Sequence, residues 1–470
     1  MFKKSQIKIL IFLISVIILS GYLLINTTII GNQNFSNLTS FLNSEQKKII
    51  KKYIFPYKLI SQQQQTISKQ QQTISQLEEN LKLIDLSNYE LLIKQEGGDI
   101  IIEKSIVKLP NNKTLKKYNL TSGFYAGISN ILPGSGYIDF HEGNMIVSSS
   151  RGVLAFKKNI EDTEENFQQI KNNIDEFIGI NQFEKHHWFS LKDIFIHNNI
   201  IFLSYTEEIR EDCVNTSIIY GDMNYENIKF EKLFSPKECV HSKENVDNEF
   251  NARQSGGRII HFDDNHILLS MGDYRSRHLA QDIKSLNGKL IKVNIDNGNY
   301  KIISMGHRNP QGLYFDEENN FILETEHGPY GGDEINLIEF SKINNDEIQN
   351  YGWAISSAGE HYGGKSEVNK TKYEKYPLFK SHIEHGFIEP LKSFVPSIGI
   401  SEIVKIGPNR YVVGSMLDKS LYFFELNEQK QIINLNRIEV FERVRDLSFN
   451  DNQLYLFMED SASIGVMNLN

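Results

Sequence analysis

The amino-acid sequence predicts an all-β fold, a six-bladed β-propeller over residues 99–470, preceded by an N-terminal transmembrane helix and a helical stalk. The composition favours β structure, with 29 Phe and 21 Tyr but 10 Pro among 470 residues. A phrase also recurs along the chain: a hydrophobic doublet, a turn of Asp, Asn or Gly, and a strand-like stretch. Its copies are "GYIDFHEGNMIVSSS", "KDIFIHNNIIFLSYTE", "RIIHFDDNHILLSMGD", "GLYFDEENNFILETEHG", "EIVKIGPNRYVVGSMLD" and "DLSFNDNQLYLFMED".

Each phrase predicts two strands joined by a tight turn, and its flanks are long enough for two more strands. Six four-stranded units indicate a six-bladed propeller, and an irregular pair of β-sandwiches is the alternative. The residues that anchor the phrases are Phe140, Ile196, Phe262, Phe315, Ile406 and Phe449.

The first 30 residues predict a signal anchor. Three lysines precede an apolar run from Ile9 to Ile25, which is long enough to cross a bilayer and can be extended to Ile30. Neither a small-residue cleavage site nor a cysteine for lipidation follows. We therefore expect a single-pass inner-membrane protein with its C-terminal domain in the periplasm. A secreted or periplasmic protein with a cleaved signal is the alternative.

Residues 31–98 predict a Gln-rich helical stalk or linker. Apolar residues recur with heptad spacing at Ile60, Ile67, Ile74 and Leu81. The seam three positions later is half polar, with Gln63, Gln70, Leu77 and Ile84. A partly apolar heptad predicts a weak homo-oligomer through residues 60–84. A single solvated helix or a Gln-rich linker explains the pattern equally well.

The net charge and the cysteine content exclude some kinds of partner and metal site. The net charge is −9 and the pI is near 5.9, and no basic stripe stands out, which argues against nucleic acid as a partner. Two cysteines, Cys213 and Cys239, are too few for a four-thiolate zinc site. In an exported domain they could form a disulfide, and two buried free thiols are the alternative.

A propeller binds ligands on loops at one end of its central channel, so site residues should directly follow the second strand of a phrase. The stretch from Gly306 to Ile338 fits this expectation, because "EHGPYGGDE" follows the strand-like "NFILETE". A Gly-Pro turn can direct two successive backbone carbonyls at one point, and such hard oxygen ligands suit Ca²⁺. An ordinary turn is the alternative.

Five stretches in this order resemble the glucose/sorbosone dehydrogenase family: "GGRIIHFDDNHILLSMGD", "AQDIKSLNGKLIKVN", "GHRNPQGL", "EHGPYGGDEINLI" and "NYGW". The resemblance extends from about Gly134 to the C-terminus and is strongest from Gly256 to Trp353. It implies a six-bladed propeller that oxidises a small sugar or alcohol with pyrroloquinoline quinone (PQQ) and Ca²⁺, as the soluble aldose sugar dehydrogenases do.

The resemblance also implies cofactor-binding residues. Arg308 and Asn309 match positions that contact PQQ, and Arg308 is also a candidate for the catalytic centre. Arg443 and Arg445 of "RVRD" match arginines that bind the PQQ carboxylates, and Lys419 matches a lysine with the same role. Arginines at i and i+2 of a strand face the same way, and each presents a fork of donors that suits carboxylates. Ordinary surface cations are the alternative.

Two calcium sites follow from the same resemblance. The carbonyls of Gly328 and Pro329 match those that bind the calcium ion holding PQQ. Asp333, Glu334 and Tyr351 match a second, structural calcium site, and solvated surface charges are the alternative.

The sequence departs from the family at the catalytic base. The family places a His four residues before the Arg that corresponds to Arg258, and this chain has Gln254 there. A neutral amide cannot act as a general base. Asp273 matches the acidic residue that orients the family His. His327 and His241 are possible substitutes, but His327 already belongs to the usual "EHGP" pattern.

Two other positions depart as well. "SSSRGVLAFKK" lacks the Gln that the family places near the cofactor, and Phe394 or Val395 stands where a Trp is expected. We therefore keep three hypotheses: a PQQ- and Ca²⁺-dependent sugar or alcohol dehydrogenase, an altered or inactive propeller that binds a ligand or a protein, and a calcium-dependent hydrolase or lyase. Fold alone does not decide among them.

Overall fold

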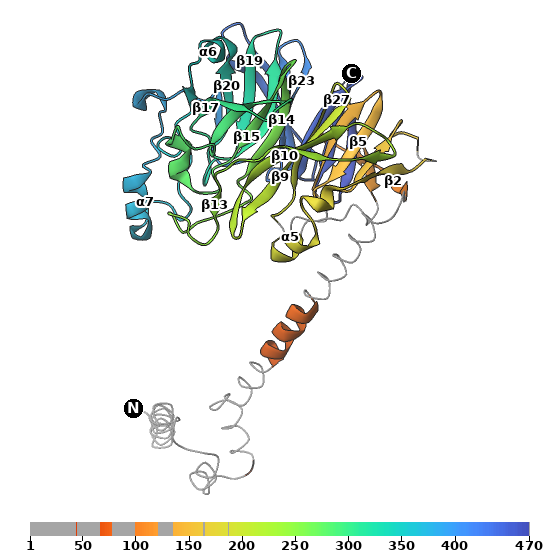
Figure 1. Ribbon diagram of the computed structural model, residues 1–470, viewed down its shortest axis with the longest axis horizontal. Helices are drawn as coiled ribbons and strands as arrows, with labels where there is room; N and C mark the ends of the chain where they lie inside the picture. Colours follow the sequence, from red (N-terminus) through yellow and green to blue (C-terminus); the bar gives the residue numbers. More distant parts are fainter. Residues whose placement is uncertain are drawn as a thin grey trace, which may run out of the picture. The chain divides into compact units, whose positions relative to one another are not determined.

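The computed structural model describes residues 44, 66–77, 99–120, 135–162, 165–186 and 188–469 (Figure 1). The chain divides into two compact units, Met1–Leu81 and Lys82–Asn470. Residues 66–77 of the first unit are helical and exposed. The anchor predicted over residues 1–30 and most of the predicted stalk lie outside the described residues. Among the described residues, no helix is long and apolar enough to span a bilayer.

The second unit contains six β-sheets, which are the blades of a propeller. The first blade consists of β4 Gly136–His141, β5 Asn144–Ser149, β6 Leu154–Lys157 and β7 Phe167–Asn172, with β1 Asp99–Ile100 and β11 Asn227–Ile228 at its edge. The second consists of β8 Leu191–His197, β9 Ile200–Arg210, β10 Cys213–Asp222, β12 Glu231–Phe234 and β13 Val240–His241. The third consists of β14 Gly256–Asp263, β15 His266–Met271, β16 Lys289–Asn294, β17 Tyr300–Met305 and β21 Gln349–Asn350.

The remaining blades follow in chain order. The fourth consists of β18 Pro310–Asp316, β19 Phe321–Glu326, β20 Asp333–Glu339 and β22 Lys392–Phe394. The fifth consists of β23 Ile400–Gly407, β24 Arg410–Ser415, β25 Ser420–Leu426 and β26 Ile432–Glu439. The sixth consists of β27 Val444–Asn450, β28 Gln453–Met458, β29 Ser463–Asn468, β3 Thr114–Leu120 and β2 Ile102–Lys108. Short helices lie between strands at α5 Ile180–Lys185, α6 Phe340–Asn344 and α7 Lys370–Lys375.

The six-bladed fold predicted from the repeated phrase is confirmed. Each phrase forms the first two strands of one blade, joined by a tight turn. In the turn between β8 and β9, Asn198 and Asn199 both have positive φ values, of 48° and 61°. Two successive left-handed residues match the twist of an antiparallel hairpin, and Asn tolerates this conformation well.

The sixth blade joins the two ends of the propeller. Its β3 strand comes from the start of the domain and pairs antiparallel with β29 at the end, from Ser463 opposite Asn119 to Val466 opposite Lys116. Closure by main-chain hydrogen bonds leaves no open gap between the first and last blades of the ring. Hydrophobic clusters then fill the spaces between neighbouring blades, as where Ile218 and Phe234 of the second blade pack with Leu269 and Ile291 of the third.

A disulfide joins Cys213 at the start of β10 to Cys239, with a Cα–Cα distance of 5.4 Å. Of the two alternatives that the sequence left open, the structure has the disulfide. The link fastens the short outer strand β13 to its blade, where Cys213 pairs with His241.

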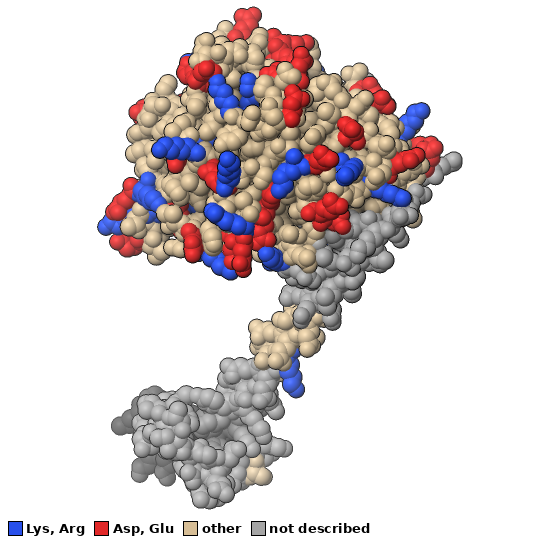
Figure 2. All heavy atoms as spheres, in the orientation of Figure 1, with Lys and Arg blue, Asp and Glu red and all other residues tan. Residues whose placement is uncertain are grey.

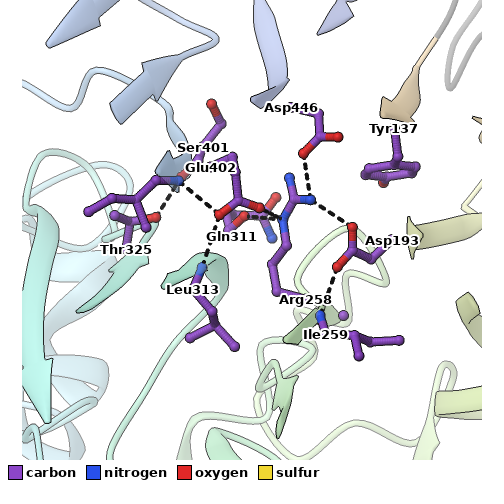
Figure 3. A network of polar contacts seen from close by, with 12 residues as sticks. Tyr137, Asp193, Arg258, Ile259, Gln311, Leu313, Thr325, Ser401, Glu402 and Asp446 are labelled. Carbon is purple, nitrogen blue, oxygen red and sulfur yellow. Dashed lines mark hydrogen bonds and ion pairs between the residues drawn. The ribbon is translucent and has the colours of Figure 1, made fainter. Parts of the chain in front are cut away.

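One guanidinium group joins the inner strands at the centre of the ring (Figure 3). Arg258 of β14 is 5% exposed, and its Nη1 lies 2.7 Å from both Asp193 Oδ1 of β8 and Asp446 Oδ1 of β27. Its Nε lies 2.6 Å from Glu402 Oε2 of β23 and donates to the Gln311 carbonyl of β18 at 2.7 Å. A single cation thus contacts four neighbouring inner strands.

The carboxylates around Arg258 extend these links to the backbone of adjacent blades. Asp193 Oδ2 accepts from Ile259 N at 2.7 Å, and Asp446 Oδ2 accepts from Ile138 N of β4 at 2.7 Å. Glu402 Oε1 accepts from Leu313 N of β18 at 3.1 Å. All six inner strands therefore belong to one hydrogen-bonded and ion-paired network centred on Arg258.

Replacing Arg258 by Met should leave three carboxylates buried without their common cation. Breaking a buried ion pair by removing one partner typically destabilises a protein by about 3–5 kcal/mol, and we expect at least this loss for R258M. Urea unfolding followed by circular dichroism measures it. Arg410→Met is a suitable control, because the Arg410 side chain is 53% exposed, and it should change stability by less than about 0.5 kcal/mol. Equal stability of the two variants would contradict a central role for Arg258.

The same network predicts that stability falls as pH rises through neutrality. Burial raises the pKa of Asp193 to about 7 and that of Glu402 to about 8, and the pKa of nearby Asp139 is raised to about 7 for the same reason. The folded chain therefore binds more protons than the unfolded chain above about pH 4. This stabilisation is complete below pH 4 and is lost as pH rises through about 7–8. The contribution of one of these groups is measured by comparing thermal midpoints of the unaltered protein and Asp139→Asn: the difference in favour of the unaltered protein should shrink between pH 5 and pH 8.5, and a difference that grows would contradict the assignment.

Candidate functional site

A cavity of about 890 Å³ opens at one end of the channel. Its walls come from the starts of inner strands and from the loops that follow second strands. These segments share one end of the ring because the two strands of each phrase are antiparallel. The volume lies within the usual range for small-molecule sites. The expectation that loops after second strands line the site is borne out by Gly328 and Pro329 after β19, by Met416 after β24 and by Glu459 after β28.

The cavity is strongly cationic, although the chain as a whole is acidic and its visible surface mixes both signs of charge (Figure 2). Two carboxylates, Asp333 and Glu459, line it, against seven basic side chains, of which Arg258 is already paired with three buried carboxylates. These are Lys192, Arg253, Arg258, Arg275, Arg308, Arg443 and Arg445. Such a concentration of positive charge within a concave surface favours a polyanionic ligand.

Arg443 and Arg445 share one buried carboxylate. Arg443 Nε donates to Glu459 Oε2 at 2.9 Å, and Arg445 Nε donates to Glu459 Oε1 at 2.6 Å. Despite the burial of Glu459, these two arginines hold the pKa of its carboxyl below the usual range, so it stays ionised. Arg445 Nη1 also donates to Gln311 Oε1 at 3.1 Å. Two guanidiniums facing a single carboxylate leave net positive charge for a ligand.

Gln254 occupies the position at which the resemblance places a His, and it lies within a cluster of polar side chains. Its amide nitrogen donates to Asp273 Oδ1 at 3.2 Å, and its oxygen accepts from Arg275 Nε and Arg308 Nη2, both at 2.9 Å. Asp273 also accepts from Trp353 Nε1 at 2.7 Å. Burial raises the pKa of Asp273, whereas Arg308 acts to lower it. The predicted neighbours Gln254, Asp273 and Arg308 are therefore in direct contact.

The "EHGP" turn forms one wall of the cavity. Gly328 N donates to Asp333 Oδ1 at 3.0 Å, and a Cβ at Gly328 would lie 1.9 Å from the Gly332 carbonyl oxygen, so only glycine fits. Arg308 Nη1 donates to the His327 carbonyl at 2.8 Å, which joins this wall to the "GHRN" segment. Asn309, which is 2% exposed, completes the wall. The turn lines the cavity, and calcium binding by the Gly328 and Pro329 carbonyls stays a prediction.

Asp333 and Glu334 do not face the same site. Asp333 lines the cavity, and its Oδ2 accepts from the backbone amides of Ile398, Gly399 and Ile400 at 2.7–3.1 Å. Successive residues of a strand point to opposite faces, and Glu334 is instead buried near His382, with 3.7 Å between Oε1 and Nε2. The paired-carboxylate arrangement expected for the second calcium site is therefore not formed. Asp333 fastens the Gly-Pro turn to the loop before β23.

Some of the other expected residues are not part of the cavity. Lys419 Nζ pairs with Asp460 Oδ2 at 2.7 Å, and Lys419 does not belong to the lining. Phe394 is buried in β22, whereas Val395 lines the cavity. His241 is outside the lining. His327 lines it, but its Nε2 lies 2.6 Å from the Ile400 carbonyl, and burial lowers its pKa.

The sequence did not single out several residues of the lining. Burial, with the nearby charges of Arg445 and Arg253, lowers the pKa of Lys192 to about 7. Lys192 Nζ donates to the Trp188 carbonyl at 3.1 Å and to Ser190 Oγ at 3.0 Å. Trp188 and Tyr362 supply aromatic surface to the same cavity. Lys192 begins the second repeated phrase and Glu459 is next to last in the sixth, but the repeat alone does not mark either residue for a role in the site.

The fold and the cavity together define a propeller with a cavity rich in basic side chains at one end of its channel. Residues 141–466 match the family described as glucose/sorbosone dehydrogenase, and the chain belongs to that family. The family expected from the sequence is thus confirmed.

Known relatives include two curated proteins. Aldose sugar dehydrogenase YliI of Escherichia coli (strain K12) is 26% identical over 295 residues, which cover 57% of this chain and 72% of that protein. Quinoprotein glucose dehydrogenase B of Acinetobacter calcoaceticus is 31% identical over 127 residues, which cover 21% of this chain and 25% of that protein.

Two solved structures share the fold. The apo-form of the soluble aldose sugar dehydrogenase of Escherichia coli has a TM-score of 0.56 at 20% identity, over 71% of this chain and 95% of that one. The PQQ-bound form of aldose sugar dehydrogenase from Streptomyces coelicolor has a TM-score of 0.51 at 16% identity, over 78% of this chain and 98% of that one.

Replacing Glu459 by Gln should lower the stability of the protein without ligand and strengthen the attraction of the cavity for anions. The change leaves Arg443 and Arg445 without their shared counter-ion, which should destabilise the protein by about 2 kcal/mol. A tricarboxylate such as citrate should then raise the thermal midpoint more for E459Q than for the unaltered protein. The exposed Glu425→Gln is the control. An equal citrate effect in all three proteins would contradict the charge balance described for this cavity.

Proposed function

We propose that the chain is a PQQ- and Ca²⁺-dependent dehydrogenase of a small sugar or alcohol. The observation that carries the proposal is the cationic cavity, whose lining has seven basic side chains against two carboxylates and includes the Gly328–Pro329 turn on one wall. When bound, PQQ supplies a two-electron oxidant for a carbon–hydrogen bond. Family membership supports the assignment of both the reaction and the cofactor.

The cavity residues fit a quinone that carries three carboxylates. Arg443 and Arg445 would hold carboxylates by charge-assisted hydrogen bonds. Arg308 and Asn309 would contact the ring system from the adjacent wall, and Trp188 or Tyr362 would cover its face. The carbonyls of Gly328 and Pro329 would hold the calcium ion. Lys419 has no assigned part, because it is paired with Asp460 outside the lining.

The proton acceptor is the part of the site in which this chain differs from its family. Gln254 cannot accept a proton, and its two ends are engaged by Asp273 and by two arginines. Lys192 is better suited, because a pKa of about 7 keeps a large fraction of its amine neutral at neutral pH. Gln254 would then orient the substrate hydroxyl group, and Lys192 would remove its proton.

A second candidate function follows from the same residue. If Gln254 marks a lost activity, the cavity binds its ligand without oxidising it. The replacement of a family base by a neutral amide favours this reading, and only turnover separates the two.

Anchoring and export remain proposals. A Cys213–Cys239 disulfide is typical of an oxidising compartment, which supports a periplasmic location. The predicted anchor over residues 1–30 would then hold the propeller at the inner membrane, and residues 60–84 would serve as a spacer or a weak oligomerisation seam.

Reconstitution tests the proposal. The full-length protein is mixed with Ca²⁺ and PQQ, and bound quinone absorbance and sugar- or alcohol-dependent dye reduction are recorded. We expect binding, and slow turnover that rises with pH through about 7 as Lys192 loses its proton. Absence of PQQ binding would exclude the dehydrogenase, and binding without turnover on any substrate would favour the second function.

Substitutions separate the two possible proton acceptors. Lys192→Met should lower turnover by about 10²-fold or more and remove the pH dependence near 7, since a general base typically contributes 10²–10⁴-fold. Lys237→Met, at an exposed lysine, is the matched control. Gln254→His should raise turnover if the cofactor is held as in the family. A Lys192→Met variant with unaltered rate and pH profile would exclude Lys192 as the acceptor.

A further inference from the structure

A buried acidic cluster lies behind the wall of the cavity, between the third and fourth blades. Glu324 and Glu326 are two residues apart on β19 and share one face of the strand. Their partners on β20 are Asn336, opposite Glu324, and Glu334, opposite Glu326. All four residues are at most 5% exposed. Among the described residues, no Lys or Arg side chain forms an ion pair with any of the three glutamates.

His307 faces this cluster from the loop between β17 and β18. It is fully buried, its ring stacks on Tyr351 with centroids 4.9 Å apart, and Ser304 Oγ lies 2.8 Å from its Nε2. When Nε2–H donates to Ser304, Nδ1 carries a lone pair. That atom lies 3.5 Å from Glu326 Oε1 and 3.8 Å from Glu324 Oε2. The Ser304 contact is the kind that orients a metal-binding imidazole.

Three buried atoms of the cluster lack hydrogen bonds; two are oxygen acceptors, and His307 Nδ1 is an acceptor when Nε2 carries the proton. Asn336 Nδ2 donates to Glu324 Oε2 at 2.9 Å and to Glu326 Oε1 at 3.2 Å. His307 Nδ1, Glu324 Oε1 and Asn336 Oδ1 have no hydrogen-bond partner, although their residues are 0% exposed. Unpartnered lone pairs beside three carboxylates, with one side-chain amide and the Arg308 backbone amide as donors, are surroundings that suit a cation.

We infer that His307, Glu324 and Glu326 bind a first-row transition-metal dication such as Zn²⁺. One donor atom from each residue can be chosen so that all lie within 4.8 Å of one another. Ligand atoms around a tetrahedral Zn²⁺ lie roughly 3.4 Å apart, close to the two His307 distances. A mixed imidazole and carboxylate set suits Zn²⁺ better than Ca²⁺, which prefers six to eight oxygen ligands.

The ligands of this centre differ from those expected for the two calcium sites, although Glu334 and Tyr351 of the second site border the same cluster. Those sites use the Gly328 and Pro329 carbonyls, and Glu334 with Tyr351, whereas this one depends on His307 and Glu324. Its position has a consequence for the cavity. His307 directly precedes Arg308 and Asn309, and Glu326 directly precedes the "HGP" turn. A metal ion here would fasten together the two segments that form one wall.

Metal content of the full-length protein, purified without chelator and without PQQ, tests the site independently of any dehydrogenase activity. We expect about one equivalent of a first-row metal that resists millimolar Ca²⁺ and is removed slowly by chelators, since the ligands are buried. Re-addition of Zn²⁺ should raise the thermal midpoint of the stripped protein. Co²⁺ should bind in its place and show visible absorption bands.

Glu324→Gln gives two effects of opposite sign. With metal, the variant should bind Zn²⁺ at least about 100-fold more weakly, because loss of even an outer partner weakens a site 10–100-fold. In chelator, it should be more stable than the unaltered protein, since one of three like charges is gone. Glu339→Gln, at an exposed carboxylate of the same sheet, should change neither result.

Two outcomes would overturn the inference. One is the absence of Zn²⁺ and Co²⁺ binding by the unaltered protein, which decides the matter even if the variant fails to fold. The other is a Glu324→Gln variant that is more stable with and without metal. Either result would mean that shared protons, not a metal ion, neutralise the glutamates.

Discussion

Arg258 is the constraint on which the rest of the structure depends. Its guanidinium lies among three carboxyl groups from three blades, and it opposes the rise in their pKa values that burial causes. Backbone amides of neighbouring inner strands donate to the same carboxylates, so the network fixes how the blades meet. The hydrophobic clusters between blades stabilise the ring, but they are non-directional. The polar centre determines the relative positions of the inner strands.

The same arginine connects the fold to the site. Arg258 also lines the cavity, and its Nη2 donates to the Arg445 carbonyl at 3.2 Å. Its Nε donates to the carbonyl of Gln311, whose side chain accepts from Arg445. The side chain that aligns the blades therefore also contacts the start of β27, where Arg443 and Arg445 line the cavity. A substitution of Arg258 would alter the geometry of the cavity as well as the stability of the ring.

Much of the fold could be predicted from the sequence because the signal is local and repeated. Each hairpin carries its own turn residues, such as the two asparagines at 198 and 199, and strand alternation then places the inner pair. Only those site residues that lie in family-like motifs were predicted, such as Gln254, Asp273 and Arg308, which are in contact. Lys192 and Glu459 lie at or beside the ends of two repeated phrases, but only the folded ring shows that their side chains meet at the cavity.

Strand alternation also explains the incorrect expectation. "DE" suggested two carboxylates on one ion, yet consecutive strand residues face opposite sides, so Asp333 joins the cavity wall and Glu334 the buried cluster. The "GHRN" and "EHGP" segments thus separate two regions of opposite charge. Cations face the cavity, and three glutamates lie behind it. The basic side chains are suited to a polyanion in the cavity, and the three glutamates are suited to a dication behind the cavity wall.

The central claim is that the cationic cavity and the Gly328–Pro329 turn together hold an anionic quinone through calcium. An equilibrium titration of the full-length protein with PQQ, in Ca²⁺ and in chelator, tests it most directly. The account predicts that Ca²⁺ tightens binding by at least about tenfold, or 1.4 kcal/mol, and that Arg443→Met with Arg445→Met weakens binding in both conditions. Binding that ignores calcium and survives loss of both arginines would contradict the account.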